Sequence, residues 1–290
     1  MQYQHLESPE EFYRLAEGYL LRQEAANNLL LGLTHNLIKR PRAYGSEPPY
    51  FGIVWDDSAE PRIVGLAIRT PPRSLILSHI EDREAIRMIV QDAYERYRSI
   101  PSVIGAKEDS RQFAELWALV SGQRVSPGMF ERIYCVQKVI PVTNVSGTAR
   151  IAGEEDRELL REWMRGFHSD AFYNQAPPTD QEVDGWISVR LNAELGGMYF
   201  WEDEDGKPVS MAGYTGFTPN GVRVGPVYTP VEYRGKGYGS AVTAAVTQTL
   251  LDSGRKFCFL FTDLSNPTSN KIYQNIGYEP IVDIDEYLFE

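Results

Sequence analysis

The sequence predicts an α/β fold of two similar domains, each with a mixed, mostly antiparallel sheet flanked by helices. Three observations support this prediction. The chain has 290 residues, about the length of two average domains. Apolar residues make up 42% of it, which is enough to build packed cores. Each half also shows the same order of elements: two helices, three strands, a helix, a strand, a helix and a strand.

The elements of the first half follow from hydrophobic periodicity and from turn residues. Leu29, Leu33 and Leu37 keep helical spacing, whereas short apolar runs between prolines are typical of strands. The predicted order is two helices within 8–38, strands at 50–55, 63–68 and 74–80, a helix at 81–97, a strand at 103–106, a helix at 111–120 and a strand at 133–140.

A polar stretch at 142–147, VTNVSG, predicts the boundary between domains at 1–141 and 148–290. After it the same order recurs. We expect helices at 154–167, 181–195, 238–252 and 267–276, strands at 198–201, 209–217, 222–229 and 257–262, and two short strands within 278–289. Short turns make the first three strands antiparallel, and a crossover helix makes the next pair parallel.

Strand 222–229 contains Gly225 and Pro226 and leads into the sequence RGKGYGS, which precedes the helix at 238–252. Proline cannot donate a hydrogen bond within a sheet, so we expect a bulge there. Glycines let the backbone approach an anion closely, and a helix start offers unpaired N–H groups and a positive dipole. The loop therefore predicts a phosphate site, to which Arg234 and Lys236 add charge.

Three phosphate-binding patterns compete for this loop. The P-loop pattern fails because Lys236 precedes Gly237, and the dinucleotide pattern fails because Ser240 stands where a third glycine is needed. The pattern [Q/R]-x-x-G-x-[G/A] is matched by Arg234, Gly237 and Gly239. A flexible glycine turn that only caps the helix is the structural alternative.

A second motif, NPTSNKIYQNIGY, spans residues 266–278. Asn266 is suited to cap a helix that Gly277 ends. Asn266, Ser269, Asn270 and Tyr273 are three or four residues apart and line one face of that helix. A half-buried core tyrosine with a bonded hydroxyl is the alternative for Tyr273.

With these two motifs in order, residues 150–290 resemble the GNAT superfamily of acetyl-CoA-dependent N-acetyltransferases. The resemblance implies acetyl-CoA as cosubstrate, with its pantetheine arm between two splayed strands. It also implies site residues. Backbone groups of Val227, Tyr228 and Thr229 would bind the arm, Arg234, Gly235, Lys236, Gly237, Tyr238, Gly239 and Ser240 the pyrophosphate, Asn266 and Ser269 the cofactor, and Tyr273 would protonate the departing thiolate.

The resemblance further implies direct attack by a primary amine of a small molecule or peptide. His168, Asp170, Glu232 or water are the candidates for the base. In the first half Glu81, Asp82 and Glu84 crowd the corresponding helix start, where they would repel a pyrophosphate. We expect that half to be a degenerate copy that lacks the cofactor loop.

Charge and composition restrict the other possible functions. A net charge of −11 opposes nucleic-acid binding and favours encounter with a cationic acceptor. Two distant cysteines predict no metal site, and the absence of a long apolar run predicts no membrane span and no signal peptide, so we expect a cytoplasmic protein. The alternative function is a non-catalytic acyl-CoA-binding regulatory protein of the same fold.

Overall fold

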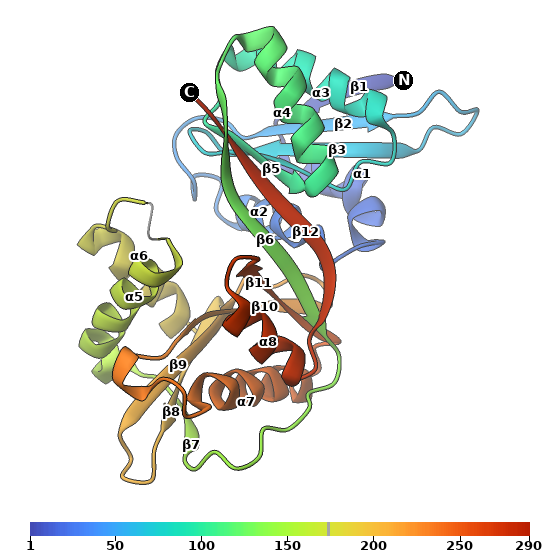
Figure 1. The fold of residues 1–290 in the computed structure, drawn as a ribbon. Helices are drawn as coiled ribbons and strands as arrows, with labels where there is room; N and C mark the ends of the chain where they lie inside the picture. Colours follow the sequence, from blue (N-terminus) through green and yellow to red (C-terminus); the bar gives the residue numbers. More distant parts are fainter. Residues whose placement is uncertain (173–174) are drawn as a thin grey trace. The chain divides into compact units, whose positions relative to one another are not determined.

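The structure is a computed structural model that describes residues 1–172 and 175–290. The chain forms two compact units, one of Met1–Ile133 with Ile281–Glu290 and one of Tyr134–Pro280 (Figure 1). Each unit has a mixed sheet with helices on both of its faces. The predicted α/β class with two similar domains is therefore confirmed.

The compact units differ from the predicted ranges of 1–141 and 148–290 at two places. Strands β6 (Val125–Val136) and β12 (Glu279–Phe289) each pass from one unit into the other. The prediction of two short strands within 278–289 was wrong, because β12 is continuous and pairs antiparallel with β5, from Ile284 opposite Ala106 to Leu288 opposite Ser102. This pairing places residues 281–290 in the first unit.

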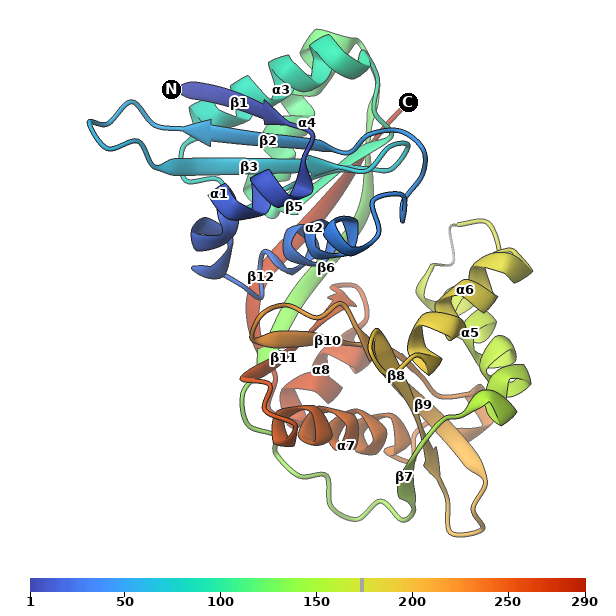
Figure 2. The same ribbon diagram turned by 180° about the vertical axis from the view of Figure 1, so that it is seen from behind.

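The first unit confirms most of the predicted elements. Its strands β1 to β5 lie in sequence order in the sheet, with β12 and then β6 after β5. Helices α1 and α2 cover one face, and α3 and α4 cover the other (Figure 2). The bounds are β1 Gln2–Leu6, α1 Pro9–Leu21, α2 Asn28–Lys39, β2 Tyr50–Trp55, β3 Ile63–Arg69, β4 Leu75–Leu77, α3 Arg83–Tyr97, β5 Ser102–Ala106 and α4 Lys107–Ser121.

Alternation along the strands explains why both faces of this sheet are covered. In β2, Tyr50 and Val54 belong to the cluster formed with α3 and α4, whereas Phe51 and Ile53 belong to the cluster formed with α1 and α2. Successive side chains of a strand point to opposite faces, so a strand that is apolar at every position needs a helical layer on each side.

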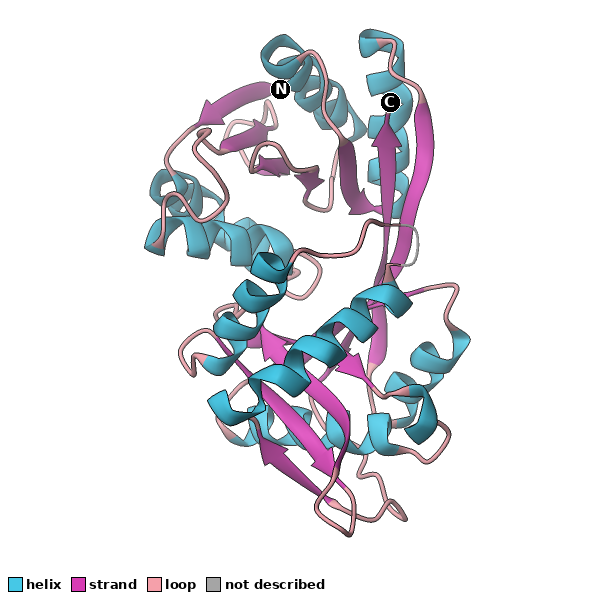
Figure 3. Ribbon diagram, turned by 90° about the vertical axis from the view of Figure 1, so that its left-hand side faces the viewer, coloured by secondary structure: helices cyan, strands magenta, loops and turns pink. Residues whose placement is uncertain are grey.

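The second unit contains β7 to β11 in the order β11, β10, β9, β8, β7, with helices on both faces of the sheet (Figure 3). Helices α5 and α6 pack on one face, and α7 and α8 on the other. The bounds are β7 Thr148–Ile151, α5 Arg157–Ala171, α6 Asp180–Leu191, β8 Gly196–Glu202, β9 Pro208–Thr215, β10 Gly221–Tyr228, α7 Tyr238–Asp252, β11 Phe257–Asp263 and α8 Pro267–Asn275.

The pairing in both units follows the predicted topology. In the second unit β8, β9 and β10 are antiparallel neighbours, and β10 and β11 are parallel. In the first unit β2, β3 and β4 are antiparallel, and β4 and β5 are parallel. Helices α3 and α7 therefore hold equivalent places as the crossover of a parallel pair. This equivalence confirms the repeat of architecture.

Candidate functional site

Strands β10 and β11 stop pairing part-way along their length. Their parallel pairs run from Gly221 opposite Phe257 to Arg223 opposite Phe259. Both strands continue after these residues, β10 to Tyr228 and β11 to Asp263, and within residues 1–172 and 175–290 no further pair joins them. The backbone groups beyond Arg223 that would have bonded to β11 are thus available for another extended partner.

The predicted bulge at Gly225 and Pro226 lies in this unpaired part of β10. The register with β9 shifts between Val224 and Val227, and Gly225 has a φ of 139° that suits glycine. A bulge bends a strand and leaves a residue out of the ladder. Here the bulge bends β10 just after Arg223, the last residue of β10 that pairs with β11.

The turn after β10 presents a row of unbonded N–H groups at the start of α7. Gly235 and Gly237 have φ values of 78° and 83°, and the first bond of the helix runs from the N–H of Ala241 to the carbonyl of Gly237. Among the described residues, the N–H groups of 235–240 donate to no acceptor. Such a row at a helix N-terminus is typical of anion-binding sites.

The equivalent helix of the first unit begins in the opposite way. The carboxylate of Asp82 caps α3 by accepting a hydrogen bond from the N–H of Glu84 at 2.9 Å. In α7 the capping residue is Gly237, which has no side chain to supply such a bond. A carboxylate already occupies the anion position in the first unit, so only α7 of these two crossover helices leaves it open.

Arg234 closes the glycine turn. Its Nε donates to the carbonyl oxygen of Thr229 at 2.8 Å, and its Nη2 pairs with Asp170 at the end of α5. The side chain is 45% exposed. The sequence assigned Arg234 to the cofactor, and the structure shows that two of its nitrogens hold the turn. Lys236 is exposed, with its Nζ 6.0 Å from the ring of Tyr233.

Residues 227–229 are half-buried, and the neighbouring strand β9 supports them. The fully buried Ser210 donates to the carbonyl of Tyr228 at 3.1 Å and bonds the hydroxyl of Thr229 at 2.8 Å. A Cβ on Gly239 would lie 3.2 Å from that Thr229 hydroxyl. This close approach explains why a glycine occupies the first turn of α7.

Helix α8 begins where β11 ends. The side chain of Asn266 caps it by accepting from the N–H of Ser269 at 3.0 Å. Asn270 donates to the carbonyl oxygens of Asp263 and Asn266 and accepts from the hydroxyl of Tyr134 at 3.0 Å. The polar stripe predicted from the sequence therefore fixes the start of α8 against β11.

Tyr273 lies one turn further along this helix. Its ring packs with Val224, Leu260 and Tyr278 in the core on the α7 side, and only 9% of the residue is exposed. Burial raises the pKa of its hydroxyl to about 12. In the described part of the chain this hydroxyl has no hydrogen-bond partner, unlike that of Tyr278, which bonds Thr247. It is therefore a protonated donor whose hydrogen bond is unused.

Comparison with known proteins places these features in a family. Residues 157–278 match the model of the acetyltransferase (GNAT) family. This range contains the turn that follows β10, the start of α7 and Tyr273. Residues 157–278 form a GNAT domain. Membership supports acyl transfer in general. None of the curated proteins matches the sequence.

Solved structures share the fold of the GNAT domain and of the rest of the chain at low identity. An acetyltransferase from the GNAT family of Colwellia psychrerythraea is 11% identical with a TM-score of 0.60, over all of both chains. A GCN5-related N-acetyltransferase from Sphaerobacter thermophilus is 16% identical, with a TM-score of 0.60 and coverage of 98% and 94%. A tandem GNAT protein from the clavulanic acid biosynthesis pathway is 11% identical, with a TM-score of 0.57 and coverage of 100% and 98%.

The three candidate bases lie in different surroundings within the GNAT domain. His168 is buried in the last turn of α5, where its ring stacks on Trp186 at 5.9 Å between centroids. Asp170 is half exposed and pairs with Arg234. Glu232 is exposed in the short turn Val231–Tyr233. Of the three, only His168 is buried.

Sequence reasoning missed two groups of this GNAT domain. Ser210 supports Tyr228 and Thr229 from the neighbouring strand, and a serine in a β-strand carries no signal of that role. Arg190 lies in the last turn of α6, and burial together with the charge of Arg223 of β10 lowers the pKa of its guanidinium. An arginine near a helix C-terminus is ordinary in a sequence, because it suits the helix dipole.

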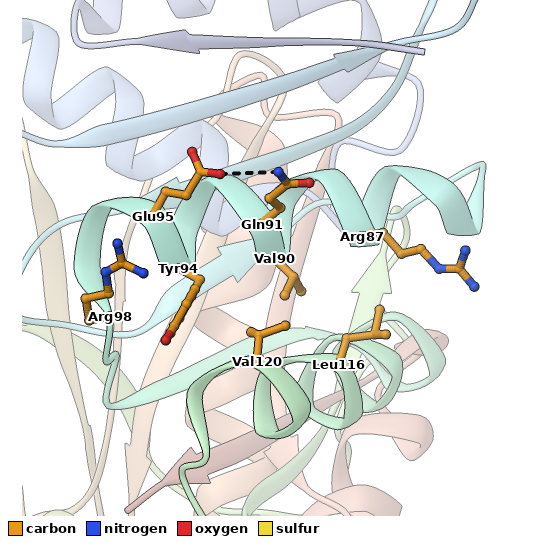
Figure 4. Close-up of a pocket in the computed structure, with 8 residues that line it drawn as sticks. All are labelled: Arg87, Val90, Gln91, Tyr94, Glu95, Arg98, Leu116 and Val120. Atoms are coloured by element: carbon orange, nitrogen blue, oxygen red, sulfur yellow. Dashed lines mark hydrogen bonds between the residues drawn. The ribbon is translucent and has the colours of Figure 1, made fainter.

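A hollow of about 810 Å³ lies elsewhere, on the first unit between α3 and α4 (Figure 4). Val90 and Tyr94 of α3 face Leu116 and Val120 of α4 across it, and Arg87 and Arg98 stand at its ends. None of the predicted site residues lines it. Among the residues that the structure describes, no helix has the length and apolar character needed to cross a membrane.

Proposed function

We propose that the unit Tyr134–Pro280 is an N-acetyltransferase that takes acetyl-CoA as donor and a primary amine of a small molecule or peptide as acceptor. The parting of β10 and β11 after Arg223 carries the proposal, because the unpaired part of β10 leads into the turn at the open start of α7. An extended arm between the strands and a pyrophosphate at the helix start would use both features at once.

The proposed donor fits the chemistry of the residues present. Backbone groups of Val227, Tyr228 and Thr229 would bond the pantetheine arm, and the N–H groups of residues 235–240 would hold the pyrophosphate. The side chains of Lys236 and Ser240, and Asn266 and Ser269 at the start of α8, lie on the turns that border this region. The thioester supplies the activated acyl group.

Tyr273 is the proposed general acid. A buried hydroxyl with a pKa of about 12 stays protonated at neutral pH, and it has no partner among the described residues to compete for its proton. The amine nitrogen attacks the thioester carbon, the carbon–sulfur bond breaks, and Tyr273 gives its proton to the departing sulfur. A backbone N–H of β10 near the bulge would stabilise the carbonyl oxygen during the attack.

The attacking amine must lose a proton to a base or to water. We propose His168 for this step before Asp170 and Glu232, because Asp170 is engaged with Arg234 and Glu232 is exposed. His168 lies on α5, on the face of the sheet opposite α7 and α8. A donor on one side of β10 and an acceptor on the other would meet at the gap between the strands.

Release of free coenzyme A from acetyl-CoA across a panel of amines tests the proposal. We expect turnover with at least one class of amine and a fall in kcat of about 100-fold or more in Tyr273→Phe. Tyr278→Phe is the matched control, because its ring lies 6.0 Å from that of Tyr273 but its hydroxyl bonds Thr247 inside the core. This control should lose stability and keep its rate.

The alternative, a non-catalytic acyl-CoA-binding regulatory protein, makes a different prediction for the same experiment. It requires tight acetyl-CoA binding without coenzyme A release for every amine, and no difference between Tyr273→Phe and Tyr278→Phe. That outcome would overturn the enzymatic proposal and leave the binding site in place.

A further inference from the structure

Arg190 is held in an unusual position for a charged residue. It stands in the last turn of α6, and its Nη1 donates to the carbonyl of Trp186 at 3.0 Å. Its Nε is buried and has no hydrogen-bond partner, although the side chain as a whole keeps some exposed surface. Among the described residues it forms no ion pair with an acidic side chain. A guanidinium so placed lacks both water and a counter-charge at one of its donors.

Arg223 lies on the same face of the sheet. Its neighbours Val222 and Val224 belong to the core on the α7 side, so the alternation of β10 directs Arg223 to the side that α5 and α6 cover. Burial, and next the charge of Arg223, lower the pKa of the Arg190 guanidinium. The two guanidinium groups are therefore close enough to repel each other.

On the β9 side the residues in the row beside Arg223 are small, whereas on the β11 side Arg223 pairs with Phe259. Arg223 pairs with Thr215 of β9, and Thr215 pairs with Gly196 of β8. A Cβ on Gly196 would lie 3.5 Å from the carbonyl of Val189, next to Arg190 in α6. On the β9 side of Arg223 this row therefore adds no second charged side chain at Thr215 or Gly196.

Arg223 also marks the point where β10 and β11 part. Val227, where the donor's arm is proposed to bind, is four positions further along β10. At about 3.3 Å per residue this separation is roughly 10 to 13 Å along the strand. The Arg223 guanidinium lies beside Gly216 at the end of β9, so an acceptor bound to it would have to bridge this separation to reach the donor's arm.

We propose that Arg190, together with Arg223, binds an anionic group, a carboxylate or a phosphate, on the acceptor, so that the acceptors of this site are small amines that carry an acidic group. This inference rests on the proposed function and specifies its substrate class. It departs from the cationic acceptor that the net charge favours, because net charge averages over the surface and says little about one face of one sheet.

Matched acceptors test this inference. 4-Aminobutyrate, 4-aminobutyramide and 3-aminopropylphosphonate present similar primary amines and differ in the distal group, which is a carboxylate, a neutral amide or a phosphonate. Thiol release should show kcat/KM at least 10-fold higher for one of the two anionic acceptors than for the amide. The better anionic acceptor identifies whether the site prefers a planar carboxylate or a phosphate-like group. Equal values for all three acceptors would overturn the inference.

Variants of Arg190 separate recognition from folding. In Arg190→Gln, KM for the anionic acceptor should rise by about 10- to 100-fold, while values for the amide stay within about 3-fold. Arg190→Lys should restore part of the loss because it restores the charge. Arg157→Gln, on the adjacent α5 and paired with Glu154, is the matched control and should change neither acceptor. A rise in KM that is equal for anionic and neutral acceptors would overturn the assignment.

Equilibrium binding distinguishes a failure of this inference from a failure of the proposed function. Calorimetric titration of the same three compounds into the full chain, with and without coenzyme A, needs no turnover. Selective binding of an anionic compound that is lost in Arg190→Gln supports the site even if no amine is acetylated. Binding of the amide as tightly as of the anionic compounds would overturn it.

Discussion

Arg234 and Thr229 are joined across the turn that links β10 to α7. The guanidinium Nε donates to the Thr229 carbonyl at 2.8 Å, and Ser210 holds the hydroxyl of the same threonine at 2.8 Å from the other side. The turn is thus fixed at its first and last residues. After Arg234, the N–H groups of residues 235–240 donate to no acceptor in the part of the chain that the structure describes.

Loss of the Arg234 bond should loosen this turn. In Arg234→Gln we expect KM for acetyl-CoA to rise by about 5- to 20-fold, since one charge-assisted hydrogen bond is worth about 1.5 to 3 kcal/mol and water replaces part of it. We expect kcat to change by less than about 3-fold. Steady-state kinetics measures both constants. A normal KM would show that the turn keeps its shape without Arg234.

Asp170 shares Arg234 with Thr229, and its substitution separates two roles. If Asp170 only pairs with Arg234, Asp170→Asn should cost about 3-fold or less in kcat/KM, because half-exposed ion pairs contribute little. If it were the general base, kcat should fall by about 100-fold or more. We expect the small effect, and the pH–rate profile of the variant checks it.

Tyr273 should also affect stability at high pH. Its folded-state pKa of about 12 exceeds the ordinary value of 10.0, so the unfolded chain releases this proton first as pH rises. The contribution to stability is complete below pH 10 and is lost between pH 10 and 12. Urea unfolding at a series of pH values measures it. The slope above pH 10 should be smaller in Tyr273→Phe, and an unchanged slope would contradict the prediction.

Much of the fold was predictable because local signals agreed with the final packing. The glycines before the helix and the spacing of apolar residues within it predicted a helix at 238–252, and α7 has these bounds. The missed strands β1 and β7 are short edge strands without a strong apolar run, QYQHL and TARI. The path of β12 beside β5 depends on residues about 180 positions apart, and no local pattern carries such information.

The site divides in the same way. The glycine turn and the tyrosine helix are contiguous motifs, so their residue types and spacing were visible in the sequence. Arg223 affects the pKa of Arg190 because α6 and the side chain of Arg223 lie on the same face of the sheet. Their proximity is a property of packing and could not be predicted from either segment alone.

We expect the buried guanidinium of Arg190 to lower the thermal stability of the folded protein. Removing a buried charge that has no ion pair relieves a desolvation penalty, so Arg190→Met should raise Tm by about 2 to 4 °C. Arg161→Met is the control, because its guanidinium pairs with Asp184 of α6 and its loss should leave Tm unchanged or lower. Thermal unfolding followed by circular dichroism measures both. A fall in Tm for Arg190→Met would give Arg190 an ordinary structural role.

Calorimetric titration of acetyl-CoA shows whether the start of α7 binds the anionic part of this molecule. Gly235 and Gly254 flank the two ends of α7, both have positive φ values, of 78° and 98°, and a Cβ at either would meet nothing within 4 Å. Glutamate imposes the same backbone strain at both places but puts a negative charge at the proposed site only in Gly235→Glu. We predict that the wild type and Gly254→Glu bind acetyl-CoA equally and that Gly235→Glu loses binding by about 100-fold or more. Equal binding by all three proteins, or no binding by the wild type, would show that the start of α7 does not bind acetyl-CoA.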